Sequence, residues 1–256
     1  MKESIDGRKH HKEIIRLEDV AKFYHMGESL IRAVDKMNIS IKEGEFVAIM
    51  GPSGSGKSTS MNLVGNLDTP THGKIFLDEK DTSYFSESDL AQLRGKKIGF
   101  IFQQFNLIPN LTALENVTLP MMFQDVEEFE RRHRGEELLK LVKLEKRMNH
   151  YPGQLSGGEQ QRVAIARALA NDPEIILADE PIGNLDSRTG EIVMEFLNKL
   201  NERGKTIVIV THEKNLAMKH AREIYWIKDG RVEKITRKFG SEWRTVSSRP
   251  SRAAKH

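Results

Sequence analysis

Three segments of the sequence carry residue types that can handle phosphate groups. The first, Gly51-Pro52-Ser53-Gly54-Ser55-Gly56-Lys57-Ser58-Thr59, follows an apolar run and precedes a helical pattern. Its glycines let backbone N–H groups curl around an anion, and the following helix adds its positive N-terminal end. The spacing fits a P-loop, in which Lys57 reaches the terminal phosphates and the Ser58 hydroxyl holds Mg²⁺. The nucleotide-binding residues expected here are Gly51, Ser53, Gly54, Ser55, Gly56, Lys57, Ser58 and Thr59.

A pair of carboxylates forms the second segment. The apolar run Ile175–Ala178 ends at Asp179-Glu180, so a strand would place both carboxylates at the C-terminal edge of a sheet, beside the phosphate loop. Asp179 is expected to bind Mg²⁺ directly or through its water. Glu180 is expected to act as general base on the attacking water. An acidic pair at the start of a loop is more often solvated, but the preceding P-loop favours the catalytic interpretation.

Three further side chains follow or accompany predicted strands. His212 comes after the apolar run Thr206–Val210, where a hydrogen bond to the γ-phosphate is expected. Gln103 follows the run Ile98–Phe102 and is expected to contact Mg²⁺ or the attacking water. Tyr24 either stacks on an adenine ring or is an ordinary half-buried aromatic residue.

The third segment is Leu155-Ser156-Gly157-Gly158-Glu159-Gln160-Gln161. Ser156 and Glu159 have the spacing of a capping box. Gly157 and Gly158 weaken the helix but leave its first backbone N–H groups unshielded, so they predict a second anion site. One nucleotide can use both anion sites if a second subunit supplies the other one.

Strands and helices alternate around these segments. The predicted strands are Ile14–Leu17, Ile39–Ile41, Glu45–Met50, Lys74–Leu77, Ile98–Phe102, Glu174–Ala178, Thr206–Val210, Ile224–Ile227 and Arg231–Lys234. The predicted helices lie at Val126–Arg147, from Ser156 to Ala170, and at Glu191–Leu200. Continuous apolar strands separated by helices favour a parallel sheet covered on both faces. We therefore expect an α/β nucleotide-binding core with a mostly helical lobe inserted at about 104–170.

Composition excludes several classes of protein. The chain has 256 residues, none of them cysteine, which excludes a disulfide scaffold and a Cys-ligated zinc or iron–sulfur site. The mean hydropathy is −0.51 and the apolar runs have strand length, which argues against an integral membrane protein. The first residues lack the apolar core of a signal peptide, so a cytoplasmic location is expected.

The basic excess belongs to the two ends of the sequence. Residues 237–256 hold six basic and one acidic residue and residues 1–16 hold five and three, which leaves 29 basic and 33 acidic residues for the body. A nucleic-acid-binding protein is expected to carry its basic patch on the body, so no nucleic-acid partner is expected. We expect a tail at 1–13, one folded domain at 14–236 and a disordered basic tail at 237–256. The alternative for the C-terminal tail is contact with anionic lipid headgroups or an acidic partner.

Together these motifs resemble the ATPases of ABC transporters, over about residues 14–235. Walker A at 51–59, the LSGGEQQR signature at 155–162, Walker B at 175–180 and the Asn184-Leu185-Asp186 loop occur in the family order. Gln103 matches the Q-loop glutamine of the family, Tyr24 its adenine-stacking aromatic residue and His212 its switch histidine. Within the family, the stretches 51–59, 99–107, 111–117 and 155–186 resemble the lipoprotein-release and macrolide-export (LolD/MacB) class.

The resemblance implies a P-loop NTPase core with an antiparallel β subdomain and an inserted α-helical subdomain. It also implies a head-to-tail homodimer that encloses two ATP molecules with Mg²⁺. Each site would combine the Walker motifs of one subunit with Ser156, Gly157 and Gly158 of the other, and Asp186 would belong to the nucleotide site. The motion would pass through the Q-loop region to a separate transmembrane permease, and the ATPase would be peripheral to the cytoplasmic face of the membrane.

The sequence departs from the family pattern at a few positions. Ile182 stands where the family usually has Thr, so a hydrogen bond is lost there. Ser60-Met61 replaces a more usual aliphatic pair, and the basic tail after about 236 is not a family feature.

Two other functions use the same motifs. The first is a non-transporting ATPase that regulates a membrane partner, as in cell division or envelope signalling. It would have the same ATP-hydrolysing motifs and the same surface for contact with the membrane partner. A soluble DNA-repair or translation ATPase is disfavoured, because no long coiled coil or second cassette is present and the body is net acidic.

Overall fold

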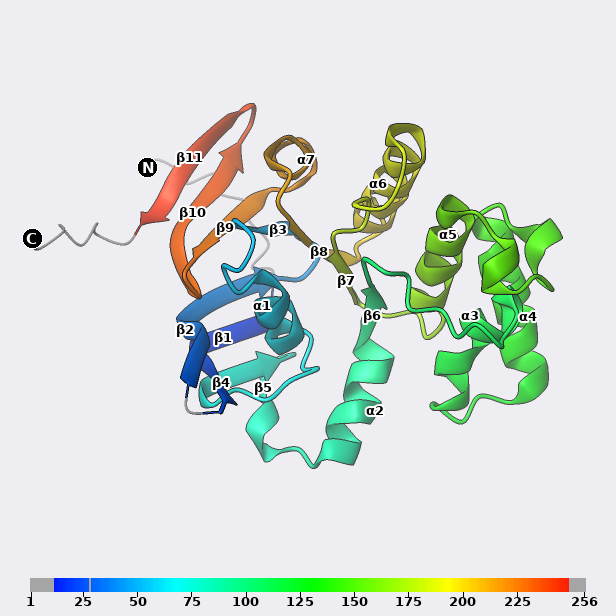
Figure 1. The fold of residues 1–256 in the computed structure, drawn as a ribbon, viewed down its shortest axis with the longest axis horizontal. Helices are drawn as coiled ribbons and strands as arrows, with labels where there is room; N and C mark the ends of the chain where they lie inside the picture. The colour runs from blue at the N-terminus through cyan, green and yellow to red at the C-terminus, as the bar shows by residue number, and fades with distance from the viewer. Residues whose placement is uncertain (1–11, 28, 249–256) are drawn as a thin grey trace, which may run out of the picture.

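Two β-sheets form the framework of the structure, a computed structural model that describes residues 12–27 and 29–248 (Figure 1). The larger sheet has seven strands, in the order β11 (Glu242–Ser248), β10 (Arg231–Phe239), β9 (Glu223–Lys228), β3 (Phe46–Met50), β8 (Thr206–Thr211), β7 (Ile175–Asp179) and β6 (Ile98–Ile101). Its strands from β9 to β6 pair in parallel, whereas β10 and β11 are antiparallel. The smaller sheet is antiparallel, in the order β2 (Ser29–Lys42), β1 (Glu13–Met26), β4 (His72–Leu77) and β5 (Lys80–Asp81). The expected α/β fold with an antiparallel β part is confirmed.

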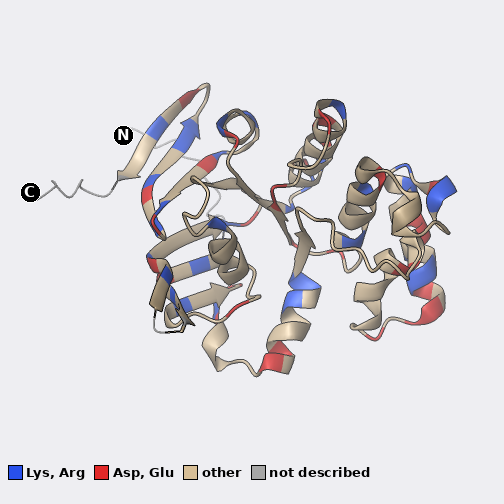
Figure 2. Ribbon diagram, viewed as in Figure 1, with Lys and Arg blue, Asp and Glu red and all other residues tan. Residues whose placement is uncertain are grey.

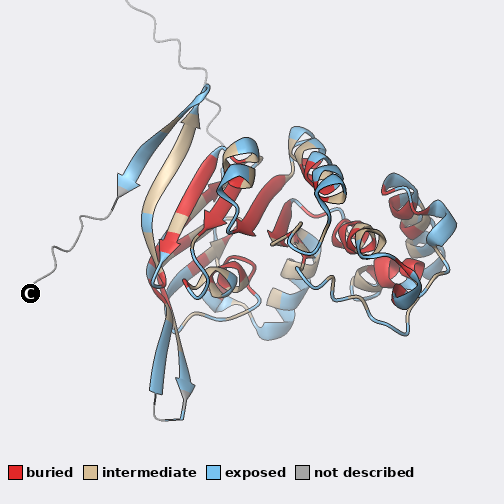
Figure 3. Cartoon of the chain, turned by 45° about the horizontal axis from the view of Figure 1, so that its top comes forward, coloured by how far each residue is buried: buried red, intermediate tan, exposed pale blue. Residues whose placement is uncertain are grey.

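Alternate residues of the central strands face two different cores, because successive side chains of a strand point to opposite faces. In β3, Phe46, Ala48 and Met50 join the core that includes the helical lobe. Val47 and Ile49 join the core under the smaller sheet. Strands β7 and β8 divide their side chains in the same way, and Figure 3 shows the resulting burial of the central sheet. The continuous apolar runs of the sequence are therefore explained by a sheet that is covered on both faces.

Seven α-helices surround the sheets in the part of the chain that the structure describes. Those of the core are α1 (Lys57–Val64), α2 (Glu87–Lys97), α6 (Ser187–Glu202) and α7 (Lys214–His220). The lobe at the right of Figure 1 contains α3 (Ala113–Met122), α4 (Glu128–Leu141) and α5 (Gly157–Ala168), and it lies within the stretch expected to be helical. Single 3₁₀ turns occur at Thr82–Tyr84, Glu145–Arg147 and Pro152–Gln154. None of the described helices combines the length and apolar character that crossing a bilayer requires.

Several elements of the fold differ from the sequence prediction, among them α2 and the first two strands. Helix α2 was not predicted, because none of its residues is buried and it has no apolar stripe; Ser86 caps it by accepting a hydrogen bond from the Asp89 N–H. Strands β1 and β2 are far longer than the short apolar runs that predicted them. Register shifts, with positive φ at Asp19 and Lys36, break the alternation that marks a strand in sequence.

The expected disordered tail at 237–256 is wrong for residues 237–248. These residues complete β10 and form β11, joined by a turn at Gly240 (φ 60°) and Ser241. A Gly-Ser pair between two strands is a hairpin signal, which the basic composition of the segment obscured. Trp243 packs against the core of the larger sheet, and Arg237 pairs with the buried Glu223. Residues 1–11, most of the expected N-terminal tail, and residues 249–256 lie outside the described residues.

The packing of Trp243 predicts a measurable stability effect. Replacing this half-buried indole by Ala removes its apolar contact with the core, so we expect the free energy of unfolding in urea to fall by about 2 kcal/mol. Val246→Ala, at an exposed position of the same strand, serves as control and is expected to change it by less than about 0.5 kcal/mol. Equal stability of the Trp243→Ala protein and the unchanged chain would contradict a folded β11.

Candidate functional site

The phosphate loop runs from the end of β3 to the start of α1, where the sequence predicts it. A Cβ at Gly51 would lie 2.3 Å from the Ile227 carbonyl oxygen and 2.5 Å from Ser55 Oγ, so only glycine fits. Gly56, the N-cap of α1, has φ 95° and no side chain to cap the helix. The first N–H groups of α1 are therefore left for a ligand, as anion binding requires.

An open cavity of about 660 Å³ brings the phosphate loop together with the ends of the central strands. It is lined by Ile31, Arg32, Ala33, Ser53, Gly54, Gly56, Lys57, Ser58, Thr59, Gln103, Asp179, Glu180, His212, Asp229 and Gly230. Every residue that the sequence assigned to catalysis or to the metal is in this set. The parallel order β3, β8, β7, β6 explains the convergence, because the C-terminal ends of parallel strands meet at one edge.

The two carboxylates differ in their surroundings. Asp179 ends β7, and burial raises the pKa of its carboxyl above the ordinary value; the charge of Glu180 raises it further, while Lys57 lowers it. The Glu180 N–H donates to the Val210 carbonyl of β8. The φ of Glu180 is 43°, which is not a strand conformation, so β7 ends just before it. The environment of Asp179 therefore favours a nearby cation.

Glu180 and His212 form a pair at the floor of the cavity. His212 Nδ1 lies 2.8 Å from Glu180 Oε1, and the Thr211 hydroxyl donates to Glu180 Oε2 at 3.4 Å. The Glu180 side chain is 11% exposed and that of His212 is 64% exposed. A held carboxylate beside an accessible imidazole can orient and deprotonate a water molecule next to a phosphate.

The donor set suits Mg²⁺ rather than a metal held by protein alone. Among residues 12–27 and 29–248, no cluster of three or more His, Cys, Asp and Glu side chains could hold a metal ion. The Ser58 hydroxyl, the Gln103 amide and the Asp179 carboxylate line the same cavity and supply oxygen ligands. Mg²⁺ commonly takes one or two carboxylates and completes its shell with water and substrate phosphates. These three residues therefore fit a magnesium ion that arrives with a nucleotide.

Two predicted loop residues, Ser55 and Gly51, support the cavity from behind it. Ser55 is buried, and its carbonyl accepts a hydrogen bond from the Gly230 N–H at 2.9 Å. The Asp35 N–H in turn donates to the Gly230 carbonyl. The Asp229-Gly230 turn, between the predicted strands Ile224–Ile227 and Arg231–Lys234, is therefore part of the site.

Tyr24 lies in β1 and does not line the cavity. Its hydroxyl donates to Asp68 Oδ2 at 2.8 Å, and the ring lies 5.2 Å from Lys22 Nζ. Partial burial and the hydrogen bond to Asp68 raise the pKa of Tyr24. Its neighbour across the β1–β2 pairing, Ile31, lines the cavity with Arg32 and Ala33 instead. Nothing in the short β2 prediction pointed to these three residues.

The predicted second anion site lies at the start of α5, outside the nucleotide cavity of the same chain. Ser156 caps the helix and forms the predicted capping box with Glu159. The Ser156 N–H and the Arg147 guanidinium hold the pKa of Glu159 below its ordinary value. A Cβ at Gly157 would meet only the Phe105 ring at 3.9 Å, so its backbone is accessible.

At Gly158, a side chain is excluded by a neighbouring residue. A Cβ at Gly158 would lie 2.7 Å from Thr189 Cγ2 in α6. Thr189 also donates its N–H and its hydroxyl to the carboxylate of Asp186, the N-cap of α6. These bonds lower the pKa of Asp186. The signature segment and the loop that ends at Asp186 therefore contact each other through Thr189.

Ile182 fills an apolar position. It packs against the larger core, and its Cβ lies 3.4 Å from the position of a Cβ at Gly190. The methyl groups of Ile182 thus contribute packing where the family pattern has a hydroxyl.

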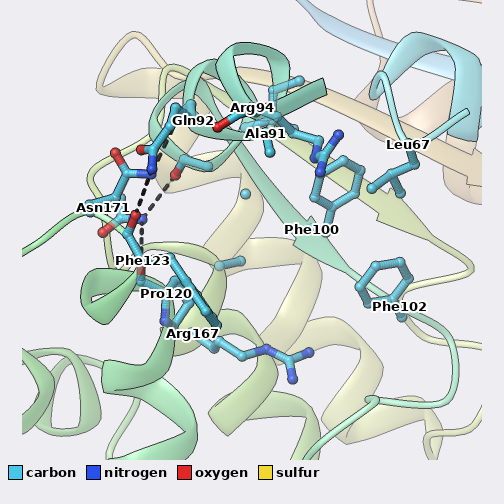
Figure 4. A pocket seen from close by; sticks show the side chains of 16 residues that line it. Leu67, Ala91, Gln92, Arg94, Phe100, Phe102, Pro120, Phe123, Arg167 and Asn171 are labelled. Carbon is cyan, nitrogen blue, oxygen red and sulfur yellow. Dashed lines mark hydrogen bonds between the residues drawn. The ribbon is translucent and has the colours of Figure 1, made fainter. Parts of the chain in front are cut away.

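A groove of about 420 Å³ lies on the other side of Gln103, between the core and the helical lobe (Figure 4). It is lined by residues of α2, β6 and the ends of α3 and α5, and by residues of the loops that follow α1 and β6. They include Leu67, Ala91, Phe100, Phe102, Pro120, Phe123 and Arg167. Asn171 spans it by donating to the carbonyls of Gly95 and Pro120. The Phe123 side chain, 68% exposed, stands at its rim.

Hydrogen bonds connect this groove with the nucleotide cavity. Arg167 donates to the carbonyls of Phe105 and Asn106, in the loop that follows Gln103. Asn184 donates to the Gln103 carbonyl at 2.8 Å. The segment 103–106 is thus held from both sides.

Known proteins resemble the chain over most of its length. The family model described as ABC transporter matches residues 34–183. An ABC transporter ATP-binding protein of Methanocaldococcus jannaschii, MJ0796, is 58% identical over 86% of this chain and 96% of its own length. The macrolide export ATP-binding/permease protein MacB of Brucella melitensis is 48% identical over 88% of this chain, which spans only 35% of MacB.

A solved structure agrees with the fold. It is a dimeric, post-hydrolysis state of the ATP-binding cassette MJ0796 bound to ADP and Pi, with a TM-score of 0.83, 54% identity and coverage of 88% of this chain and 99% of that one. The matches indicate the same kind of protein as the phosphate loop and the carboxylate pair do. The chain belongs to the ABC transporter family and is an ATP-binding cassette ATPase.

Proposed function

We propose that two copies of this chain form a head-to-tail homodimer that binds two ATP molecules and hydrolyses them to drive a separate transmembrane permease. The observation that carries the proposal is that the predicted nucleotide-binding residues lie at two separate places in one chain. The Walker residues, Gln103 and His212 line one cavity, whereas Ser156 and Gly157 cap a helix outside it. A second copy, turned head to tail, would supply the missing anion site. The dimeric state of the solved MJ0796 cassettes supports this arrangement.

The predicted site residues of the cavity would have distinct roles in this reaction. The loop N–H groups and Lys57 bind the phosphates, and Glu180 takes a proton from the attacking water while His212 holds the γ-phosphate. Ser58, Gln103 and Asp179 would hold Mg²⁺, which supplies charge neutralisation for the phosphates when bound. Ile31 and Arg32 line the cavity and would flank the nucleoside, and Tyr24 pairs with Ile31 on the neighbouring strand.

Coupling to the permease uses the groove behind Gln103. A permease segment seated against Phe123 and Phe100 would contact both the core and the helical lobe. The Arg167 and Asn184 hydrogen bonds would pass its position to the segment that carries Gln103. The printed name of MacB, an ATP-binding/permease protein, supports a membrane permease as the partner. The ATPase would then be held at the cytoplasmic face of the membrane, and MacB supports an export-type or release-type substrate.

Phe123→Glu tests the coupling surface. A charge at the rim of an apolar groove opposes burial of a partner there, so the variant is expected to lose the membrane protein that co-purifies with the tagged ATPase. Its ATP hydrolysis without the partner should be unchanged, because Phe123 ends α3 in the helical lobe and does not line the cavity of the phosphate loop. Mass spectrometry of the purified complex and phosphate release measure the two effects.

Phe129→Glu is the matched control. Phe129 is 83% exposed on α4 and does not line the groove, so the Phe129→Glu protein should still co-purify with the membrane partner. Co-purification of the partner with both variants alike would refute the groove as the docking site. A co-purified partner that moves no solute in vesicles would favour the regulatory ATPase over the transporter.

A further inference from the structure

A separate cavity of about 560 Å³ lies between the helical lobe and the core. Its walls come from the end of α4, the middle of α5 and the outer face of α6, and Figure 1 shows α5 between the other two helices. It shares no lining residue with the nucleotide cavity or with the groove behind Gln103. Its volume is in the range of small-molecule sites.

The wall of this cavity is largely apolar. The apolar lining residues are Leu141, Val142, Ile165, Ile192, Val193, Phe196 and Leu200. Two of them, Leu141 and Ile192, are nearly half exposed, at 45% and 48%. Leu141, Leu200 and Arg203 also line an adjoining cavity of about 330 Å³, so the apolar surface continues along α4 and α6. A hydrocarbon chain laid there would cover surface that is otherwise open to water.

The charged residues around the same cavity are mostly basic. Four basic residues line it against the single acid Glu195: Lys143, Arg162, Lys199 and Arg203. Within residues 12–27 and 29–248, none of these four side chains makes an ion pair or a hydrogen bond, and Arg162 Nε is buried without a partner. In the adjoining cavity, by contrast, Arg134 pairs with Glu137 at 3.8 Å and Lys205 with Asp172 at 2.8 Å.

We propose that this cavity binds a single-chain amphiphile with an anionic headgroup, such as a fatty acid or an alkyl phosphate. The headgroup would pair with Arg162, Lys199 and Arg203, which line the cavity and have no ion-pair partner among the described residues. The alkyl chain would lie against Phe196 and Ile165 and extend toward the adjoining cavity. Carboxylate and phosphate headgroups share this recognition chemistry.

Calorimetric titration of the nucleotide-free, full-length protein with dodecanoate and with dodecyl phosphate tests the proposal. Both are expected to bind one per chain at concentrations below micelle formation, and octanoate about 10²-fold or more weakly, because each buried methylene contributes. Dodecyl maltoside, which has the same chain and no charge, should bind far less. The measurement needs no nucleotide, dimer or permease, so its failure leaves the proposed function intact.

Variants locate the site. Arg162→Gln is expected to weaken dodecanoate binding about tenfold, as the loss of one charge-assisted hydrogen bond predicts. The double variant Lys199→Gln/Arg203→Gln alters only exposed side chains, so it should fold normally and weaken binding to a similar extent. Lys140→Gln, an exposed α4 residue outside the cavity, is the matched control and should bind as the unchanged chain does.

Three outcomes would overturn the proposal. The first is no binding of either anionic amphiphile. The second is binding of equal strength to dodecyl maltoside or to all variants, which indicates a site elsewhere. The third is binding of an acidic amphipathic peptide at this face without binding of dodecanoate, which indicates a protein partner instead. If Arg162→Gln does not fold, the double variant decides alone.

Discussion

Glu180→Gln should leave ATP binding intact and lower the rate of ATP hydrolysis about 10²–10⁴-fold, the usual contribution of a general base. The amide keeps the size of the side chain and can still accept the hydrogen bond from the Thr211 hydroxyl. It cannot take a proton from water. With hydrolysis blocked, ATP should remain bound between two chains, so a dimer should accumulate on gel filtration when ATP is present. Phosphate release and fluorescent-nucleotide titration measure the two effects.

Glu191→Gln is the control for this experiment, because Glu191 is an exposed acid of α6 outside the nucleotide cavity. It should hydrolyse ATP at the unchanged rate. A fully active Glu180→Gln protein would remove Glu180 as the base, and the neighbouring Asp179 would have to be reconsidered. A dimer that also fails to accumulate would argue against ATP held between subunits.

Ser156→Arg should abolish hydrolysis while each chain still binds ATP. The bulky cation would stand where the partner's phosphates are expected, whereas Ser156 lies outside the cavity of its own chain. The substitution also removes a helix cap, which costs about 1 kcal/mol of stability. Ser86→Arg removes the corresponding cap of α2 and serves as the matched control, with hydrolysis expected to be retained.

Mixing two inactive proteins gives a sharper form of the same test. Lys57→Ala should lose nucleotide affinity, because the loop then lacks its phosphate-binding cation. A mixed dimer of Lys57→Ala and Ser156→Arg chains contains one intact site, made from the unaltered half of each chain. Partial recovery of hydrolysis on mixing is therefore expected. If the mixture stays as inactive as its components, sites shared between subunits are ruled out.

Local chemistry made much of the site predictable. The phosphate loop, Asp179 and His212 each follow a continuous apolar strand, and parallel pairing alone brings such strand ends together. The capping box at Ser156 was also readable, because its two partners are three residues apart. The head-to-tail pairing of chains had to come from the family resemblance, since no spacing within one chain encodes it.

Other parts depend on contacts between distant segments. Arg32 and Gly230 reach the cavity because β2 and the β9–β10 turn pack beside the phosphate loop, and neither segment carries a sequence signal for nucleotide binding. No residue of helix α2 is buried, and the helix has no apolar periodicity to detect. The hairpin at Gly240 was not predicted, because the basic residues around it, such as Arg237 and Lys238, suggested a solvated tail. Basic and acidic residues are in fact interspersed over both sheets and the helical lobe (Figure 2).

The contact between Gly158 and Thr189 joins the first turns of α5 and α6, one helix from each half of the molecule. If the angle between α5 and α6 changes, this contact in their first turns would move least. Side chains farther along the two helices, such as Arg162 and Phe196, would then move more. A ligand bound between those two side chains would therefore influence the angle between the helices without contacting the nucleotide.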